Sequence, residues 1–174
     1  MALTPGLRKF ALAVHLTCSV GWLGTVVAYL TLDLTVATSQ DPEAVRAAWI
    51  AMGLVTSWAI VPFAISSLVT GLVMSLGTKW GLFRHWWVLI SLLLTAFATV
   101  VLLSEAGVIG RLAGVAADPA TSSDTLLDLP HTLPHSVGGL LVLVVVQVLN
   151  VYKPQGLTPY GWRKQREQRG LSAS

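Results

Sequence analysis

The feature that most constrains the fold is a long apolar run, Phe10–Leu34, with the sequence FALAVHLTCSVGWLGTVVAYLTLDL. About 24 residues pass before the first charged side chain, Asp33, and a helix needs roughly 20 apolar residues to cross the hydrocarbon layer of a bilayer. The run contains His15, and an ionisable side chain at that depth costs several kcal/mol unless it faces protein and finds a partner. We therefore expect a transmembrane helix and take His15 as a candidate functional residue.

Composition supports a membrane protein, since 54% of the 174 residues are hydrophobic and only 11% are charged, against roughly 25% charged in soluble domains. The single cysteine, Cys18, excludes an intramolecular disulfide. No apolar segment alternates like the strands of a membrane β-barrel. We predict an all-α, four-transmembrane-helix bundle over residues 1–152 and a basic tail over 153–174. The expected spans are Phe10–Leu32, Trp49–Leu76, Trp86–Leu103 and His135–Tyr152.

Lysine and arginine near the ends of spans predict the orientation, because they are enriched in cytoplasmic loops. They precede the first span, lie between the second and third, and fill the tail, leaving only Arg46 and Arg111 opposite, where seven of the eight acids lie. Both termini should be cytoplasmic. The tail should lie on anionic lipid headgroups, and nothing in it requires a nucleic-acid partner. The residues on the cytoplasmic side are Arg8, Lys9, Lys79, Arg84, Lys153, Arg163, Lys164, Arg166 and Arg169, with Trp80, Trp86 and Trp87 in an interfacial belt.

Two segments depart from simple spans. About 33 residues separate Arg46 from Lys79, roughly 50 Å if wholly helical, so this segment should project, tilt or bend, with Pro62 as the natural bend. The connection from Ala106 to Pro134 is long enough to carry a short helix of its own, for which Ser123–Leu129 is the candidate.

Asp33 and Glu105, at the ends of spans, are expected to be solvated caps.

Counting 1.5 Å per helical residue from the cytoplasmic charges places His15 roughly 10 Å deep, near Met74, Ser91 and Thr95. Helical periodicity puts His15, Cys18, Ser19 and Trp22 on one face. His15 is either an axial ligand of haem b within the bundle or a neutral imidazole bonded to a serine or a backbone carbonyl. A second ligand could be Met74, His85 after a register slip, or His15 of a second subunit in a homodimer; five-coordinate iron is the remaining possibility.

A second polar group falls near the opposite surface. Glu105, Tyr29, His131 and His135 all lie roughly 27–33 Å from the cytoplasmic charges. Imidazole and carboxylate ligands suit copper or zinc, so His131, His135 and Glu105 form a candidate metal site, and His135 could instead bind a second haem. The alternative is two interfacial histidines bonded to Asp128 and water. Proline disfavours helix at the preceding residue, so Pro134 leaves His131 as a possible loop residue.

Enzymatic activity is left undecided and finds little support in the sequence, because the chain has no Gly-rich phosphate loop, no G-x-S-x-G and no H-E-x-x-H. Small residues recur at every fourth position of the first three spans, for example Thr17, Gly21 and Thr25. Such stripes allow close helix packing in lipid. An alternative function is therefore a cofactor-free accessory subunit of a larger membrane complex, with these stripes as its contact surface.

The segment VHLTCSVGWLG of the first helix resembles the opening helix of a broad group of small bacterial membrane proteins, which includes copper-resistance protein D and HemJ-type proteins. The segments WGLFRHWWVLISLLLTAFATVVLL and GGLLVLVVVQVLNVYKPQGLTPYG resemble uncharacterised actinobacterial four-span membrane proteins. The first resemblance implies that His15 holds haem while Trp22 and Gly24 shape its pocket. Together they imply a bacterial plasma-membrane protein, with b-type electron transfer or haem handling as its expected function and copper handling as the alternative.

Overall fold

The computed structural model describes residues 4–78 and 81–171, so Lys79 and Trp80 lie outside the described residues. Within these ranges the chain is helical and forms no strand; a single isolated bridge joins His85 to Leu157. The elements are α1 (Pro5–Thr38), α2 (Pro42–Val55), the π turn η1 (Thr56–Ile60), α3 (Val61–Gly77), α4 (Trp86–Ala117), α5 (Ser123–Leu127), α6 (Leu133–Tyr152) and α7 (Pro159–Leu171).

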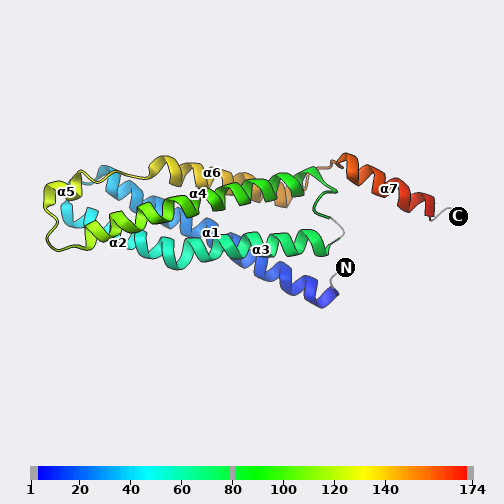
Figure 1. The fold of residues 1–174 in the computed structure, drawn as a ribbon, viewed down its shortest axis with the longest axis horizontal. Coiled ribbons are helices and arrows are strands. Elements are labelled where there is room, and N and C mark those ends of the chain that lie inside the picture. Colours follow the sequence, from blue (N-terminus) through cyan, green and yellow to red (C-terminus); the bar gives the residue numbers. More distant parts are fainter. Residues whose placement is uncertain (1–3, 79–80, 172–174) are drawn as a thin grey trace.

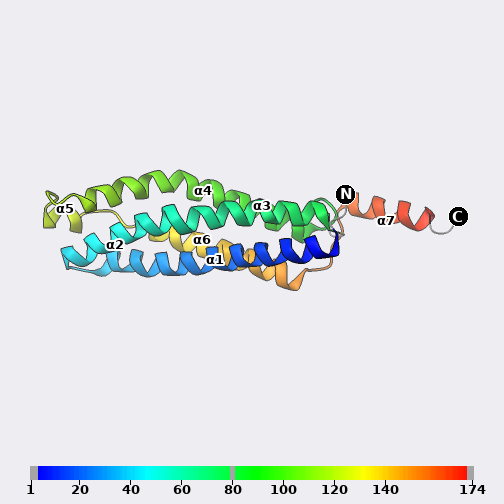
Figure 2. The ribbon, with the colours of Figure 1, turned by 90° about the horizontal axis from the view of Figure 1, so that it is seen from below.

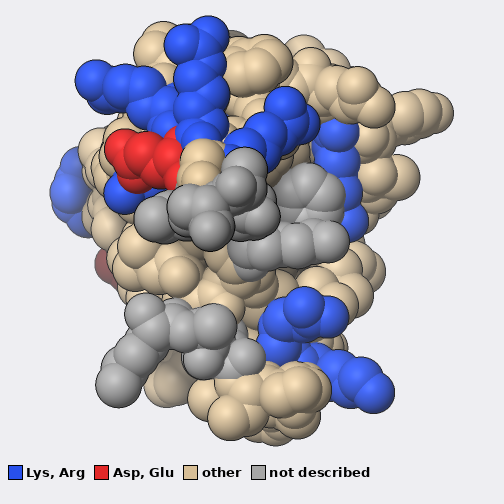
Figure 3. Space-filling view, turned by 90° about the vertical axis from the view of Figure 1, so that its right-hand side faces the viewer, with Lys and Arg blue, Asp and Glu red and all other residues tan. Residues whose placement is uncertain are grey.

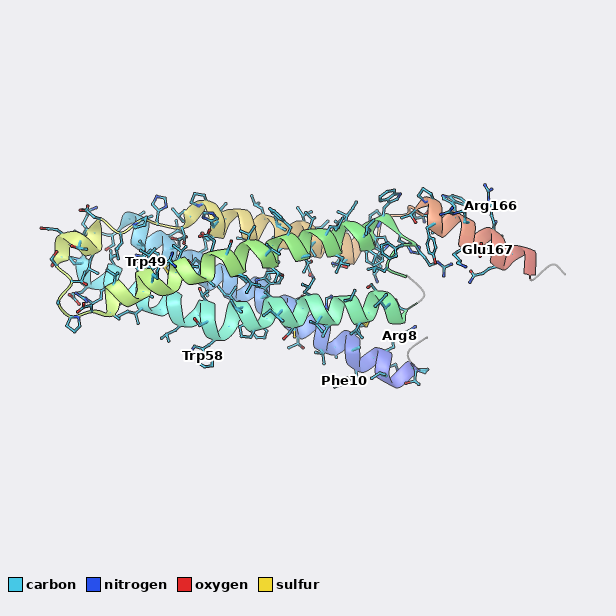
Figure 4. The ribbon with its side chains drawn as sticks, in the orientation of Figure 1. Arg8, Phe10, Trp49, Trp58, Arg166 and Glu167 are labelled. Atoms are coloured by element: carbon cyan, nitrogen blue, oxygen red, sulfur yellow. The ribbon has the colours of Figure 1, made fainter. Side chains whose placement is uncertain are left out.

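Four helices are long and apolar enough to cross a membrane: Pro5–Thr38, Pro42–Gly77, Trp86–Ala117 and Leu133–Tyr152. Large apolar side chains stay exposed along them, including Trp58 at 81% and Val100 at 66%, and Trp58 projects away from the helices in Figure 4. Exposed apolar surface on this scale needs an apolar environment. The predicted set of four long apolar helices is confirmed, and it indicates a multi-pass membrane protein.

The four long helices lie side by side along one axis (Figures 1 and 2). α1 packs against α3 and α6, and α4 packs against the same two helices, so α1 and α4 are diagonal to each other. We call the end where α1 begins and α6 ends the basic end; Figure 3 shows lysine and arginine gathered on it. The opposite end, the α5 end, is where α2 packs against α1 and α4 and where α5 contacts α2.

The second apolar segment is one continuous helix of 36 residues. Where the sequence predicted a bend at Pro62, the structure has a π turn, Thr56–Ile60, just before the proline. The N–H of Val61 bonds to the carbonyl of Thr56, five residues back instead of four. A proline lacks the N–H for the normal bond and crowds the carbonyl four residues earlier, and widening the preceding turn is a common way to relieve this.

α4 continues to Ala117, well past the predicted end at Leu103. The extension packs against α2, where a Cβ on Gly53 would lie 2.6 Å from the Cβ of Ala113. Only glycine allows this approach, so Gly53 fixes the register of the two helices. Arg46 then caps the end of α4 by donating to the carbonyls of Ala116 at 2.6 Å and Asp118 at 2.9 Å. The remaining connection carries α5 over Ser123–Leu127, as predicted.

α6 ends at Tyr152 and is followed by Lys153, whose φ of 46° is left-handed. The chain then runs beside the start of α4, where the N–H of Thr158 donates to the carbonyl of Arg84 at 3.0 Å. From there α7 points away from the other helices along their long axis (Figure 1). The tail is therefore helical over Pro159–Leu171 and directed outward from the basic end, and its contact with anionic headgroups stays a prediction.

The buried core is concentrated toward the α5 end. Its largest fully buried side chains are Trp49 and Met52 at 0% exposure, Leu126 and Val45 at 1%, and Trp49 is marked there in Figure 4. α2 supplies Val45, Trp49 and Met52, and it fills the space between α1 and α4. Near the basic end α3, which continues α2, packs against the same two helices, but the side chains there leave a cavity in the interior.

Candidate functional site

The interior near the basic end contains a cavity of about 560 Å³, which we call the inner cavity. Pockets for small molecules and cofactors span roughly 300–1,000 Å³. α1, α3, α4 and α6 all contribute to its wall. Its polar or ionisable lining residues include Arg8, His15, Ser19, Ser67, Ser75, Thr78, Ser91, Thr95, Gln147, Asn150 and Lys153, and the apolar ones include Leu12, Trp22, Met74, Trp87 and Leu143.

His15 lies on this wall, held by α3. Its Nδ1 is 3.0 Å from the hydroxyl oxygen of Thr70, and that hydroxyl donates to the carbonyl of Ser66 at 2.6 Å. In the tautomer that carries its proton on Nδ1, His15 donates to Thr70 while Thr70 donates to Ser66, and the lone pair of the ring is then on Nε2. Gly71 makes room for the ring, because a Cβ there would lie 3.1 Å from His15 Cε1.

The predicted inner group is brought together in part. Met74, Ser91 and Thr95 line the inner cavity with His15 and Trp22. Gly24, by contrast, is exposed, and a Cβ there would meet nothing within 4 Å, so it does not line the inner cavity. His85 precedes α4 and pairs with Leu157, also outside the cavity wall.

Two polar lining residues, Gln147 and Asn150, were not singled out from the sequence. Gln147 and Asn150 of α6 line the inner cavity, one turn apart; their signal was two amides in an otherwise apolar span. Ser19 of α1 and Ser67 of α3 share a hydrogen bond of 2.8 Å. The Oγ of Ser91 is buried and has no hydrogen-bond partner within residues 4–78 and 81–171. The inner cavity therefore offers unused hydrogen-bonding capacity.

A second cavity of about 280 Å³ lies toward the α5 end, and we call it the outer cavity. Trp22, 3% exposed, and Leu143, 8% exposed, line both cavities, so these two side chains stand between them. The wall of the outer cavity includes Val26, Tyr29, Thr56, Phe97, Val101, Leu102, Glu105, Ile109, Thr132, Pro134, His135, Ser136, Gly138 and Gly139.

Two of the three predicted outer metal ligands meet. His135 Nε2 lies 3.7 Å from Glu105 Oε1, whereas His131 is exposed and precedes the start of α6 at Leu133. With Pro134 in its first turn, the helix cannot begin early enough to align both rings. Over the described ranges, no group of three or more His, Cys, Asp or Glu side chains lies close enough to hold a metal ion.

Asp33 was predicted to be a solvated cap, and this prediction is wrong. The side chain is fully buried, with 0% exposure. Its Oδ1 accepts from the N–H of Thr132 at 2.9 Å, and its Oδ2 accepts from the hydroxyls of Thr132 at 3.0 Å and Ser136 at 2.7 Å. Tyr29 joins through a 2.8 Å bond to Thr132. Charge-assisted bonds of this kind compensate the burial of a carboxylate. The sequence signal was the buried face Trp22, Val26, Tyr29, Asp33, which continues the His15 face.

No protein-family model, curated protein or solved structure matches this chain. The fold and the two cavities therefore define only a class, an all-helical chain with four membrane-length apolar helices and a histidine-lined interior. The resemblance of the first helix to haem-binding membrane proteins stays a prediction.

Proposed function

We propose that the inner cavity binds haem b, with His15 as the axial ligand. The observation that carries this proposal is the hydrogen bond from His15 Nδ1 to Thr70. Histidines that bind metals usually donate their other ring N–H to a fixed acceptor, which sets the tautomer and the ring orientation. Here the acceptor is itself fixed by its bond to Ser66, and the ring lies on the wall of a cavity of cofactor size.

The opposite wall suggests that His15 is the single strong ligand. α4 is diagonal to α1, and it offers the hydroxyls of Ser91 and Thr95 to the inner cavity. Met74 follows Gly71 by three residues on α3, the helix that holds His15, so it lies beside the imidazole and not across from it. We infer that His15 would be the one strong ligand that the chain supplies to the haem, with Met74 lining the pocket beside it.

The mouth of the inner cavity suits the carboxylates of haem. Arg8 of α1 and Lys153 after α6 both line it, and cationic side chains bind carboxylates through charge-assisted hydrogen bonds. The apolar lining from Leu12 to Leu143 suits the macrocycle. When bound, haem supplies one-electron chemistry, so the function would be b-type electron transfer or haem handling.

We also propose that the four helices form a transmembrane bundle in a bacterial plasma membrane, with both termini in the cytoplasm. The support is the lysine and arginine at the basic end (Figure 3), since these residues mark cytoplasmic ends of spans. The inner cavity would then open toward the cytoplasmic leaflet and the outer cavity toward the other side.

The decisive experiment is a visible spectrum of detergent-purified protein with stoichiometric haem b added. We expect a Soret band that is lost in His15→Ala and kept in the control His85→Ala, whose ring lies outside the cavity wall. Bound copper without a Soret band would instead favour copper handling, and neither would favour an accessory subunit. Either of these two results would overturn the haem proposal.

A further inference from the structure

We propose that the outer cavity binds the ring of a lipid-soluble quinone. The inference is independent of haem in the inner cavity, because it rests on different residues beyond the partition formed by Trp22 and Leu143.

The outer cavity has a wall that reaches the apolar surface. Phe97 lines the cavity and is 63% exposed, so part of this side chain borders the cavity and the rest borders the surrounding apolar phase. On α6 the neighbouring wall consists of Gly138 and Gly139, where a Cβ would meet nothing within 4 Å. Access therefore runs sideways between α4 and α6, which selects a ligand that arrives dissolved in lipid.

A polar group with no partner lies in the same wall. Thr56 is 1% exposed, and its Oγ1 has no hydrogen-bond partner within residues 4–78 and 81–171. A helical threonine ordinarily donates to a carbonyl three or four residues back, as Thr70 and Thr99 do. Leaving a buried hydroxyl unbonded destabilises a protein, and Thr56 belongs to the wall of the outer cavity, so a small adjustment of that wall on binding would let the hydroxyl donate to a ligand oxygen.

A second polar pair lies on the α4 and α6 side of the outer cavity. His135 and Glu105 are 3.7 Å apart, with side-chain exposures of 54% and 26%. The contact of Gly53 with Ala113 sets antiparallel α2 and α4 in register, which places Thr56 within about one to two turns of the depth of Glu105. The outer cavity is therefore apolar in the middle, with hydrogen-bonding groups on different helices around it.

This arrangement fits a quinone ring better than an acyl chain or a metal ion. A quinone has a flat apolar ring with an oxygen on each of two opposite edges, so one oxygen can accept from Thr56 and the other from His135. An acyl chain has no oxygen to use these groups. A metal ion lacks a third ligand of the usual kind in the described ranges.

The test is a titration of purified full-length protein, without added haem, with a short-tailed benzoquinone carrying a decyl chain. Binding is followed by quenching of tryptophan fluorescence, because Trp22 lines the outer cavity. Thr56→Val, which removes only the hydroxyl, should weaken binding about tenfold. Gly139→Leu should abolish it by filling the cavity.

Two controls separate the binding role of Thr56 from a structural one. Thr99→Val, at a residue 4% exposed that bonds its own helix, should leave quinone affinity unchanged. Thr56→Val should also match or exceed the parent in thermal stability, because it removes an unbonded hydroxyl from the interior. His15→Ala should lose haem but keep quinone affinity, so the two proposals fail separately.

Equal quinone affinity in Thr56→Val and Thr99→Val would overturn the inference. Displacement of the quinone by decanol at equal concentration would overturn it as well, because the cavity would then recognise only an alkyl chain.

Discussion

Asp33 of α1 accepts hydrogen bonds from both the N–H and the hydroxyl of Thr132, at 2.9 and 3.0 Å, and is fully buried. The two residues are 99 positions apart. Their contact ties α1 to the start of α6, and with Ser136 and Tyr29 it closes the end of the outer cavity nearest α5.

This network should stabilise the fold. In Asp33→Ala the N–H of Thr132 and the hydroxyl of Ser136 lose their shared acceptor, at a cost of about 3 kcal/mol, so the unfolding temperature in detergent should fall by roughly 6–12 °C. Glu43→Gln is the control, because this exposed acid makes only a 3.8 Å surface pair with Arg46 and such pairs contribute little. An unchanged unfolding temperature in Asp33→Ala would contradict this role.

Thr70 should act on haem through His15. Thr70→Val removes the acceptor that holds Nδ1, and losing such a partner typically costs about 10–100-fold in metal affinity. Haem titration monitored at the Soret band measures this loss. Thr99→Val is the matched control, since it removes a buried hydroxyl that bonds only to its own helix. Equal haem affinity in the two variants would argue that the Thr70 bond is only structural.

The coordination of the haem iron should show one protein ligand. We expect a high-spin, five-coordinate spectrum that changes when imidazole or carbon monoxide is added, because the wall diagonal to His15 carries hydroxyls. Met74→Leu should leave the spectrum unchanged, as Met74 lies beside His15 on α3. A low-spin spectrum that becomes high-spin in Met74→Leu would show that Met74 ligates the iron.

The outer histidine should not affect the inner cavity. His135 lines the outer cavity only, beyond Trp22 and Leu143, so His135→Ala should keep its full Soret band. Loss of all haem in this variant would refute the separation of the two sites and the depth assigned to His15.

Chemical labelling tests the proposed orientation. With Cys18→Ser removing the single native thiol, one cysteine is introduced at Ser122 beside α5 or at Gln165 on α7. A membrane-impermeant maleimide should label Ser122→Cys in intact cells and Gln165→Cys only after permeabilisation. The reverse pattern would invert the orientation and place the inner cavity on the outer side.

Local sequence predicted the elements better than their ends. The four apolar runs, the helix near Ser123 and the departure of His131 from α6 all follow from hydropathy and from Pro134. The extension of α4 to Ala117 could not be read locally, because it depends on packing against α2 at Gly53. Asp33 was misassigned for a related reason: an acid at the end of a span is normally solvated, and the donors that bury it come from α6.

The sequence by itself determined that four helices form, which ends carry the cations, and which face of α1 holds His15, Trp22 and Asp33, because hydropathy and the helical repeat act within a few turns of chain. The tertiary structure decided what meets that face. The start of α6 brings the donors Thr132 and Ser136 to Asp33, whereas near the basic end the four helices leave a cavity beside His15. That difference arises from contacts between distant segments, which no local pattern encodes.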